Sequence, residues 1–328
     1  GTAGMVVSGT LSTGLGGMTS ALGGTGGAGG NGGDITVTNT GSILVEGAAS
    51  VGILAQSIGG GGGAGGFTGS LAVTGGSLNT QVGATGGAGG DGGDVTVTST
   101  GSIVTLADDS IAVLAQSIAG GGGQSAYAIT AQAGAFDGVN LNLGAQGEGI
   151  SGRQGQVVVN LSGGVLQTAG ALSYGLLAQA IGAGGGNVAL SVPDPLEVGS
   201  NGLTLQLGST GGVAGDGNVI DVTNANEVYT KGAGAVGFAA QSIGGGGGTE
   251  GVTGDVVLGS GDAVWAINVG GSGDSAGSGE AITIANSATI VTEGDGAIGL
   301  RRDSRLAAAA ALARWRSALP MVRFRALR

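Results

Sequence analysis

Residues 52–58 read Gly-Ile-Leu-Ala-Gln-Ser-Ile and run directly into a tract of five glycines, 59–63. Close variants of this string return at residues 112–118, 175–181 and 237–243. The copies are spaced 60, 63 and 62 residues apart, counted at the glutamines Gln56, Gln116, Gln179 and Gln241. A long string that recurs in tandem at a nearly fixed period indicates a repeat architecture.

A pair of short β-type segments precedes most copies of the string. Residues 34–39 read Asp-Ile-Thr-Val-Thr-Asn, and residues 94–99 repeat them almost unchanged. Related segments follow at 220–224 and 282–286. Because apolar and polar residues alternate with a period of two, these segments are predicted to be strands.

We therefore predict an all-β fold, a glycine-rich, repeat-built parallel β-helix (β-solenoid). No stretch before residue 300 has a convincing helical period. A coil of a parallel β-helix needs roughly 20 residues, so one unit is expected to hold about three coils. Roughly fifteen coils at ~4.8 Å each would form a rod about 70 Å long.

Two regions are expected. Residues 1–300 form a solenoid of about five units of roughly 62 residues, in which residues 1–24 look like the end of an earlier repeat. Residues 301–328 form a basic tail rich in alanine and arginine. The chain begins with Gly1 and shows no signal peptide, so we expect it to be an internal fragment.

The composition of the chain also allows the alternative that it is disordered rather than folded as a solenoid. Glycine contributes 81 of 328 residues, while charged residues make up 9% and aromatic residues 3%. Such a bias is common in unfolded chains. Apolar residues nevertheless reach 41%, and their alternating runs keep a fixed spacing that a flexible linker does not need. We therefore favour a folded repeat.

The tail breaks the repeat abruptly. Adding the 62-residue period to the glycines at 244–248 predicts glycines at 306–310, but the alanine run Ala307–Ala311 stands within one residue of these positions. A GGC codon tract read one frame over becomes GCG, which encodes alanine, so residues 301–328 are interpreted as a non-native frameshift product. The alternative is a native basic amphipathic helix around Trp315 that lies on anionic membranes.

Charge excludes nucleic acid as a partner of the repeat region. Residues 1–300 hold twenty acidic residues against two basic ones, Arg153 and Lys231, a net charge of −18. Nucleic-acid binding needs clustered cations. The chain also contains no cysteine, so disulfides and thiolate metal sites are ruled out.

Enzymatic chemistry finds little support, and we expect no enzyme activity and no cofactor. The chain has no histidine and a single lysine, so imidazole-dependent triads and a GxxxxGK phosphate loop are missing. The enzyme class that we considered is the carbohydrate-cleaving β-helices. The candidate catalytic carboxylates would be two pairs that are close in sequence, Asp91 with Asp94 and Asp108 with Asp109. No basic residue lies near either pair in the sequence.

Calcium is the small ligand that the sequence suggests most directly. Residues 89–95 partly match the GGxGxDxUx signature of calcium-binding β-rolls, which makes Asp91 and Asp94 candidate ligands, with Asp34 as a counterpart one unit earlier. The tandem nine-residue repetition is absent. We favour flexible glycine turns, each capped by an aspartate before a strand.

The repeated glutamines allow two interpretations. Gln56, Gln116, Gln179 and Gln241 could form a ligand-binding row on an exposed face, or they could stack into a structural amide ladder. The second is favoured, because a solenoid places equivalent residues of successive coils in register and stacked amides bond to one another.

Units of this kind, with the string GILAQSIGGGGG at residues 52–63, resemble the passenger regions of Gram-negative autotransporters, the type V secreted surface proteins. The resemblance spans roughly residues 21–300 and carries no catalytic residues. It implies a β-helical passenger that is carried across the outer membrane by a C-terminal β-barrel, which we expect in the full-length protein and outside this chain. It also implies an extracellular or cell-surface location.

Two functions follow from this resemblance. The first is a non-catalytic adhesin or virulence-type passenger that contacts a host-cell or neighbouring-cell surface. The second is a passive stalk that displays a distal domain. An exposed aromatic or apolar patch would favour the adhesin, because binding hot spots need such anchors. The aromatic residues are scattered singly, which leaves the stalk open.

Overall fold

The computed structural model describes residues 6–11, 17–22, 24–66, 68–73, 77–82, 85–124, 128–133, 138–143, 151–186, 191–192, 201–207, 212–248, 263–269 and 275–305. Every regular element in these ranges is a β-strand, and all strand pairs are parallel. The predicted all-β, parallel β-solenoid is therefore confirmed. Tail residues 306–328, including the alanine run, lie outside the described residues.

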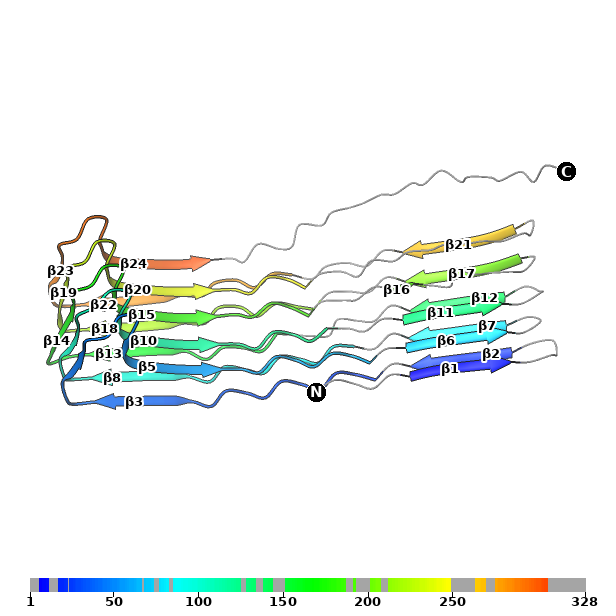
Figure 1. Ribbon diagram of the computed structural model, residues 1–328, viewed down its shortest axis with the longest axis horizontal. Coiled ribbons are helices and arrows are strands. Elements are labelled where there is room, and N and C mark those ends of the chain that lie inside the picture. The colour runs from blue at the N-terminus through cyan, green and yellow to red at the C-terminus, as the bar shows by residue number, and fades with distance from the viewer. Residues whose placement is uncertain are drawn as a thin grey trace.

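Three five-stranded sheets surround the apolar core at one end of the molecule (Figure 1). The first contains β3 (Ile35–Asn39), β8 (Val95–Ser99), β13 (Val157–Leu161), β18 (Ile220–Asn224) and β22 (Ile282–Asn286). The second contains β4 (Ile43–Val45), β9 (Ile103–Thr105), β14 (Val165–Thr168), β19 (Glu227–Thr230) and β23 (Ile290–Thr292). The third contains β5 (Val51–Ile58), β10 (Ile111–Ile118), β15 (Tyr174–Ile181), β20 (Val236–Ile243) and β24 (Ile298–Arg305).

Two further sheets lie at the opposite end (Figure 1). One contains β1 (Val6–Leu11), β6 (Thr68–Val73), β11 (Ala128–Ala133) and β16 (Ser191–Val192). The other contains β2 (Gly17–Leu22), β7 (Ser77–Val82), β12 (Gly138–Leu143), β17 (Asn201–Leu207) and β21 (Ala263–Val269). Each unit of the repeat contributes one strand to each sheet, apart from the four-stranded one.

The coil length predicted from the sequence is wrong. Every strand pairs with the equivalent strand one full repeat later, as in Gln56 with Gln116 and Gln116 with Gln179. One repeat unit is therefore one coil, not three. Five coils advance only about 19 Å along the stacking direction at ~4.8 Å per step, and most of each coil runs sideways.

The glycine tracts are straight segments rather than the turns that we expected. In the first coil they span residues 24–34 and 59–66 and connect the two ends of the molecule (Figure 1). Together with their equivalents in later coils they form what we call the glycine stem. The amides of Gly26, Gly29 and Gly32 donate to the next coil at 2.9, 2.8 and 2.7 Å. This three-residue period is that of a polyproline II helix, which cannot satisfy its own backbone groups.

Hydrogen bonds also join the two layers of the stem. Gly60 N donates to Gly30 O at 2.8 Å, Gly90 N to Gly60 O at 2.7 Å, and Gly120 N to Gly90 O at 2.9 Å. A Cβ placed on Gly29 would lie 2.0 Å from Gly60 O. The layers therefore approach more closely than any side chain permits, which explains why glycine recurs at these positions.

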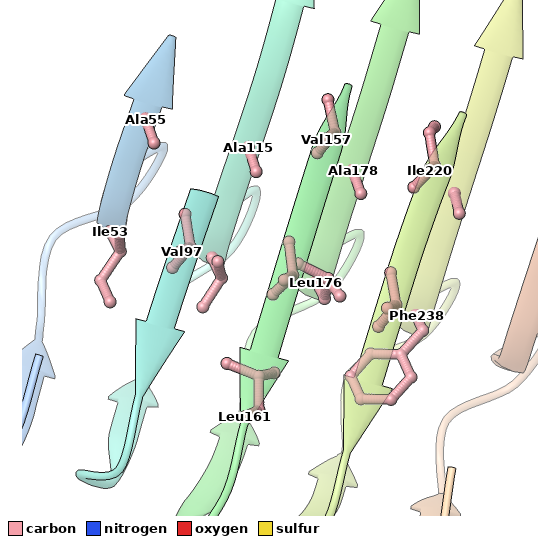
Figure 2. Packing of buried hydrophobic residues seen from close by; sticks show 14 of the residues in the cluster. Ile53, Ala55, Val97, Ala115, Val157, Leu161, Leu176, Ala178, Ile220 and Phe238 are labelled. Carbon is pink, nitrogen blue, oxygen red and sulfur yellow. The ribbon is translucent and has the colours of Figure 1, made fainter. Parts of the chain in front are cut away.

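The core is narrow and is built from medium-sized aliphatic side chains. Inward-facing residues of the three sheets at one end stack on their equivalents in neighbouring coils (Figure 2). Val95, Val97, Val157 and Val159 are fully buried, and Phe238 is the largest fully buried side chain. Stacked columns of this kind bury each coil against the next, so interior coils are better covered than the first and the last.

One column of the core contains threonines whose hydroxyl groups lack a hydrogen-bond partner. Thr105, Thr168 and Thr230 face inward in register, and the hydroxyl of each is buried without a hydrogen-bond partner. In the first coil the same column holds Val45. A buried unsatisfied hydroxyl costs about 1–3 kcal/mol, so the three threonines are local weak points.

Thr168→Val should therefore stabilise the fold by about 1 kcal/mol, because valine has nearly the same shape and no hydroxyl to desolvate. Guanidinium denaturation followed by circular dichroism measures the change. Thr98→Val, on the outward face of β8, is the matched control and should change the free energy of unfolding by less than about 0.5 kcal/mol. A destabilised Thr168→Val variant would mean that the hydroxyl has a partner, such as an internal water.

Candidate functional site

The outward side of the β5–β10–β15–β20–β24 sheet carries the most regular side-chain pattern on the molecule. Along β5 the residues Ile53, Ala55 and Ser57 are buried, so Leu54, Gln56 and Ile58 point outward. Strict register repeats this arrangement in the next three coils. We call this surface the glutamine face, and it has three rows. The leucine row is Leu54, Leu114, Leu177 and Ala239. The glutamine row is Gln56, Gln116, Gln179 and Gln241, and the isoleucine row is Ile58, Ile118, Ile181 and Ile243.

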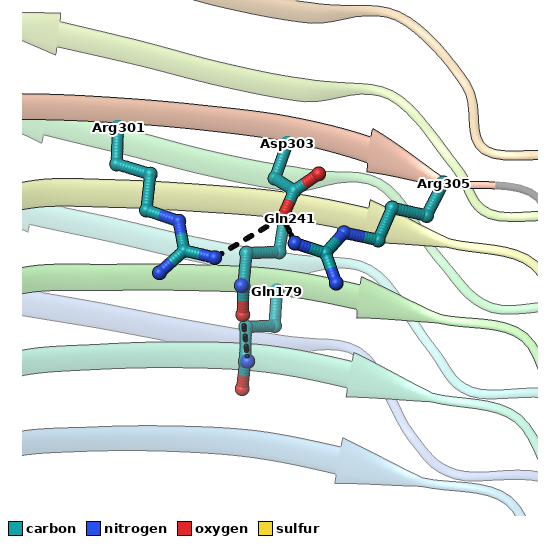
Figure 3. A network of polar contacts seen from close by, with 5 residues as sticks. All are labelled: Gln179, Gln241, Arg301, Asp303 and Arg305. Carbon is teal, nitrogen blue, oxygen red and sulfur yellow. Dashed lines mark hydrogen bonds and ion pairs between the residues drawn. The ribbon is translucent and has the colours of Figure 1, made fainter.

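The glutamines form a continuous ladder of side-chain amides, and Figure 3 shows its last rung, between Gln179 and Gln241. Gln56 Nε2 donates to Gln116 Oε1 at 2.5 Å, Gln116 donates in the same way to Gln179, and Gln179 Nε2 donates to Gln241 Oε1 at 2.6 Å. The structure therefore brings all four sequence-predicted glutamines together. The ladder satisfies polar groups within the face and holds the flanking apolar rows at constant spacing.

In strand β24 charged residues replace the apolar and glutamine rows of the glutamine face. Arg301, Asp303 and Arg305 occupy the three outward positions, in register with Ala239, Gln241 and Ile243. Arg301 Nη2 lies 3.3 Å from Asp303 Oδ2, and Arg305 also pairs with this oxygen (Figure 3). The hydrogen bond from Arg305 is the main cause that lowers the pKa of the Asp303 carboxyl. The strand thus continues for five residues into the segment assigned to the tail.

The apolar rows of the glutamine face are only partly covered. Leu54 and Ile58, on the first coil, are 53% and 56% exposed. Ile118, Leu177, Ile181 and Ile243 are half-buried between their neighbours, whereas Leu114 and Ala239 are buried. By contrast, the outward positions of the β3–β8–β13–β18–β22 sheet hold mainly threonine, such as Thr38 and Thr98, and also include Asn160. The two broad sides of the core therefore differ in polarity.

Beneath the glutamine face, buried serines join the third sheet to the glycine stem. Ser57 Oγ donates to Gly33 O at 2.8 Å and accepts from Gly93 N, one coil later, at 2.8 Å. Ser117 repeats both bonds with Gly93 and Gly155, at 2.9 and 2.7 Å. Each hydroxyl thus links two layers and two coils. The sequence did not predict this bridging role for the serines, although their recurrence in three of four copies was a usable signal.

The third coil has Ala180 in place of this serine, and a second substitution in the same coil accounts for the difference. In the coils that keep serine, a glycine faces the hydroxyl, and a Cβ on Gly92 would lie 2.7 Å from Ser117 Oγ. The third coil has Gln154 at the position of Gly92. Gln154 is 5% exposed, and its Oε1 is buried without a partner. A larger residue at one position is therefore compensated by a smaller residue at the other.

This compensation predicts strong coupling between positions 154 and 180. Ala180→Ser alone should destabilise the fold, because the new hydroxyl collides with Gln154. Combined with Gln154→Gly it should form the two hydrogen bonds made by Ser117, which gives a coupling free energy of about 1–3 kcal/mol in favour of the double variant. Urea denaturation of the four proteins of the cycle measures it. Additive effects of the two substitutions would disprove the compensation.

The candidate calcium ligands bond to the backbone instead of converging on one point. Asp34 Oδ1 accepts from Asp94 N at 2.9 Å, and Asp94 Oδ1 accepts from Gln156 N at 2.8 Å. Asp91 Oδ1 accepts from Arg153 N at 2.6 Å. Each aspartate therefore caps the same position one coil later. In the ranges that the structure describes, no three His, Cys, Asp or Glu side chains gather into a group that could hold a metal ion.

The second carboxylate pair lies in the turn between β9 and β10. Asp108 Oδ1 accepts from Ala171 N, one coil later, at 2.8 Å. Asp109 adopts a left-handed backbone conformation with φ 55°, as do Ala49 (51°) and Leu172 (53°) at the equivalent turns. Asp108 thus makes the same kind of backbone contact as Asp34, Asp91 and Asp94.

The fold and the glutamine face define a parallel β-solenoid protein with one coil of 60–63 residues per repeat. Comparison of the chain with known protein families, with curated proteins and with solved structures finds no match in any of the three. Among the described residues, no helix is long and apolar enough to cross a membrane.

Proposed function

We propose that this chain is a non-catalytic, surface-exposed passenger region of a Gram-negative autotransporter that acts in adhesion to a host-cell or neighbouring-cell surface. The observation that carries this proposal is the glutamine face, on which four successive coils present apolar rows on both sides of an amide ladder. Apolar rows that remain partly exposed on a regular sheet are typical of interaction surfaces.

The dimensions weigh against a passive stalk as the main role. About 300 residues advance the solenoid by only about 19 Å along its axis. Coils of roughly 20 residues would extend the same chain about three times as far. Long coils instead widen the lateral faces, which suits a protein that contacts a surface sideways. The absence of cysteine agrees with export of the chain in an unfolded state.

Surface display tests the proposal. The chain is fused to an outer-membrane β-barrel carrier in a Gram-negative host, and its exposure is verified by protease treatment of intact cells. Cells that display it should bind a host-cell monolayer several-fold better than cells with the carrier alone. Ile118→Glu, within the glutamine face, should abolish the gain because it places a charge inside one of the two apolar rows. Asn160→Glu, on the opposite sheet, adds the same charge and should not.

Equal attachment of displaying cells and carrier-only cells, with the chain accessible to protease, would refute adhesion and leave the stalk. A chain that remains protected from protease in intact cells would refute surface exposure itself.

A further inference from the structure

We propose that the glutamine face is a self-association surface, on which a second copy of this chain packs sheet against sheet to form a two-fold dimer. The inference concerns the purified chain in solution and does not depend on surface display. It rests on the order of the rows, on the area that they cover and on the charge of the last strand.

The order of the rows makes the face self-complementary. The glutamine row lies midway between the leucine row and the isoleucine row, two residues from each along every strand. A two-fold axis parallel to the stacking direction and above the glutamines places the leucine row of one copy against the isoleucine row of the other. It also places the two amide ladders opposite each other. Identical faces with stacked amides and interdigitated aliphatic side chains form dry interfaces.

The area fits a weak dimer. Four eight-residue strands, β5, β10, β15 and β20, cover about 26 Å by 19 Å, which is roughly 500 Å² per copy. The pair would bury about 1,000 Å², the lower limit for a specific protein–protein interface. A reversible, concentration-dependent dimer is therefore expected rather than a permanent one.

Strand β24 limits the interface. Its outward residues carry two positive charges and one negative charge, and the two-fold axis would bring Arg301 of one copy near Arg305 of the other. This repulsion weakens the dimer and is screened by salt. Arg305 occupies the end of the isoleucine row, so Arg305→Ile would extend that row to the fifth coil.

Sedimentation equilibrium of the full chain over low-micromolar to submillimolar concentrations tests the proposal. The wild-type mass should rise from 30.3 kDa toward twice that value. Ile181→Glu should weaken association by at least about tenfold, and Asn160→Glu should leave it unchanged. Arg305→Ile should strengthen it. This gain keeps the test decisive if Ile181→Glu fails to fold, which circular dichroism would reveal.

Single-cysteine crosslinking tests the geometry, since the chain has no cysteine of its own. The packed sheets would lie about 10 Å apart, within reach of a short bis-maleimide. Gln179→Cys should yield crosslinked dimer because position 179 lies on the axis, whereas Asn160→Cys should not. A wild-type chain that stays monomeric throughout, or growth beyond a dimer that Ile181→Glu does not affect, would overturn the proposal. The second result would point to end-to-end pairing of open strand edges.

Discussion

Gly120→Ala should destabilise the solenoid by about 3–5 kcal/mol, although it adds one methyl group. The new Cβ would lie 2.0 Å from Gly60 O and 2.5 Å from Gly60 C. Both are backbone atoms of the coil below, so no side-chain rotation relieves the collision. The layers of the stem would have to separate and lose the bond from Gly120 N to Gly90 O, which is 2.9 Å long.

The adjacent glycine is the control. A Cβ on Gly121 would be 3.6 Å from its nearest neighbour, Gly184 O, which is ordinary van der Waals contact. Gly121→Ala should therefore be neutral or stabilising by up to about 1 kcal/mol, because alanine restricts the unfolded chain. Guanidinium denaturation followed by far-ultraviolet circular dichroism compares the two. Equal effects would mean that the stem is not packed backbone against backbone.

Phe238→Ala should cost about 3–5 kcal/mol of stability. Phe238 is 1% exposed and is the largest fully buried side chain, and it packs in a column that holds Leu176 in the coil before (Figure 2). The cavity left by the ring cannot be filled by an adjacent coil, because the strands are fixed in register. Phe238→Leu, which copies the neighbouring coil, should cost less than half as much.

Tyr229→Ala provides the comparison for an aromatic residue that is not in the core. Tyr229 lies on the outward side of β19, and its hydroxyl bonds Glu227 Oε2 at 3.0 Å. The loss should stay below about 1 kcal/mol in the same denaturation experiment. If Tyr229→Ala were as damaging as Phe238→Ala, the assignment of the inward and outward sides of this end would be wrong.

Strand positions and register were predictable because the physics that sets them is local. Alternation around Ile35 and Val37 marks β3, and the recurring string at residues 52–58 marks β5. Parallel stacking then brings equivalent residues together, so the glutamine ladder followed from the spacing of the copies. The apolar rows flanking it could have been predicted by the same alternation.

Coil length could not be predicted in this way. A glycine tract that turns and a glycine tract that runs straight have the same composition, and only pairing between coils distinguishes them. The bonds of Gly26 and Gly29 to residues 59 positions later are such long-range contacts. The compensation between Gln154 and Ala180 was hidden for the same reason, because the two positions meet only after the coil has closed.

A single distance distinguishes one coil per repeat from several coils per repeat. Thr36 and Thr283 are exposed, and register connects them through Thr96, Val158 and Asp221 across four coil steps. Spin labels on Thr36→Cys and Thr283→Cys, measured by pulsed electron paramagnetic resonance, should report a backbone separation of about 19 Å, broadened by the labels. Coils of roughly 20 residues would place the same positions about 60 Å apart, and that result would contradict the fold described here.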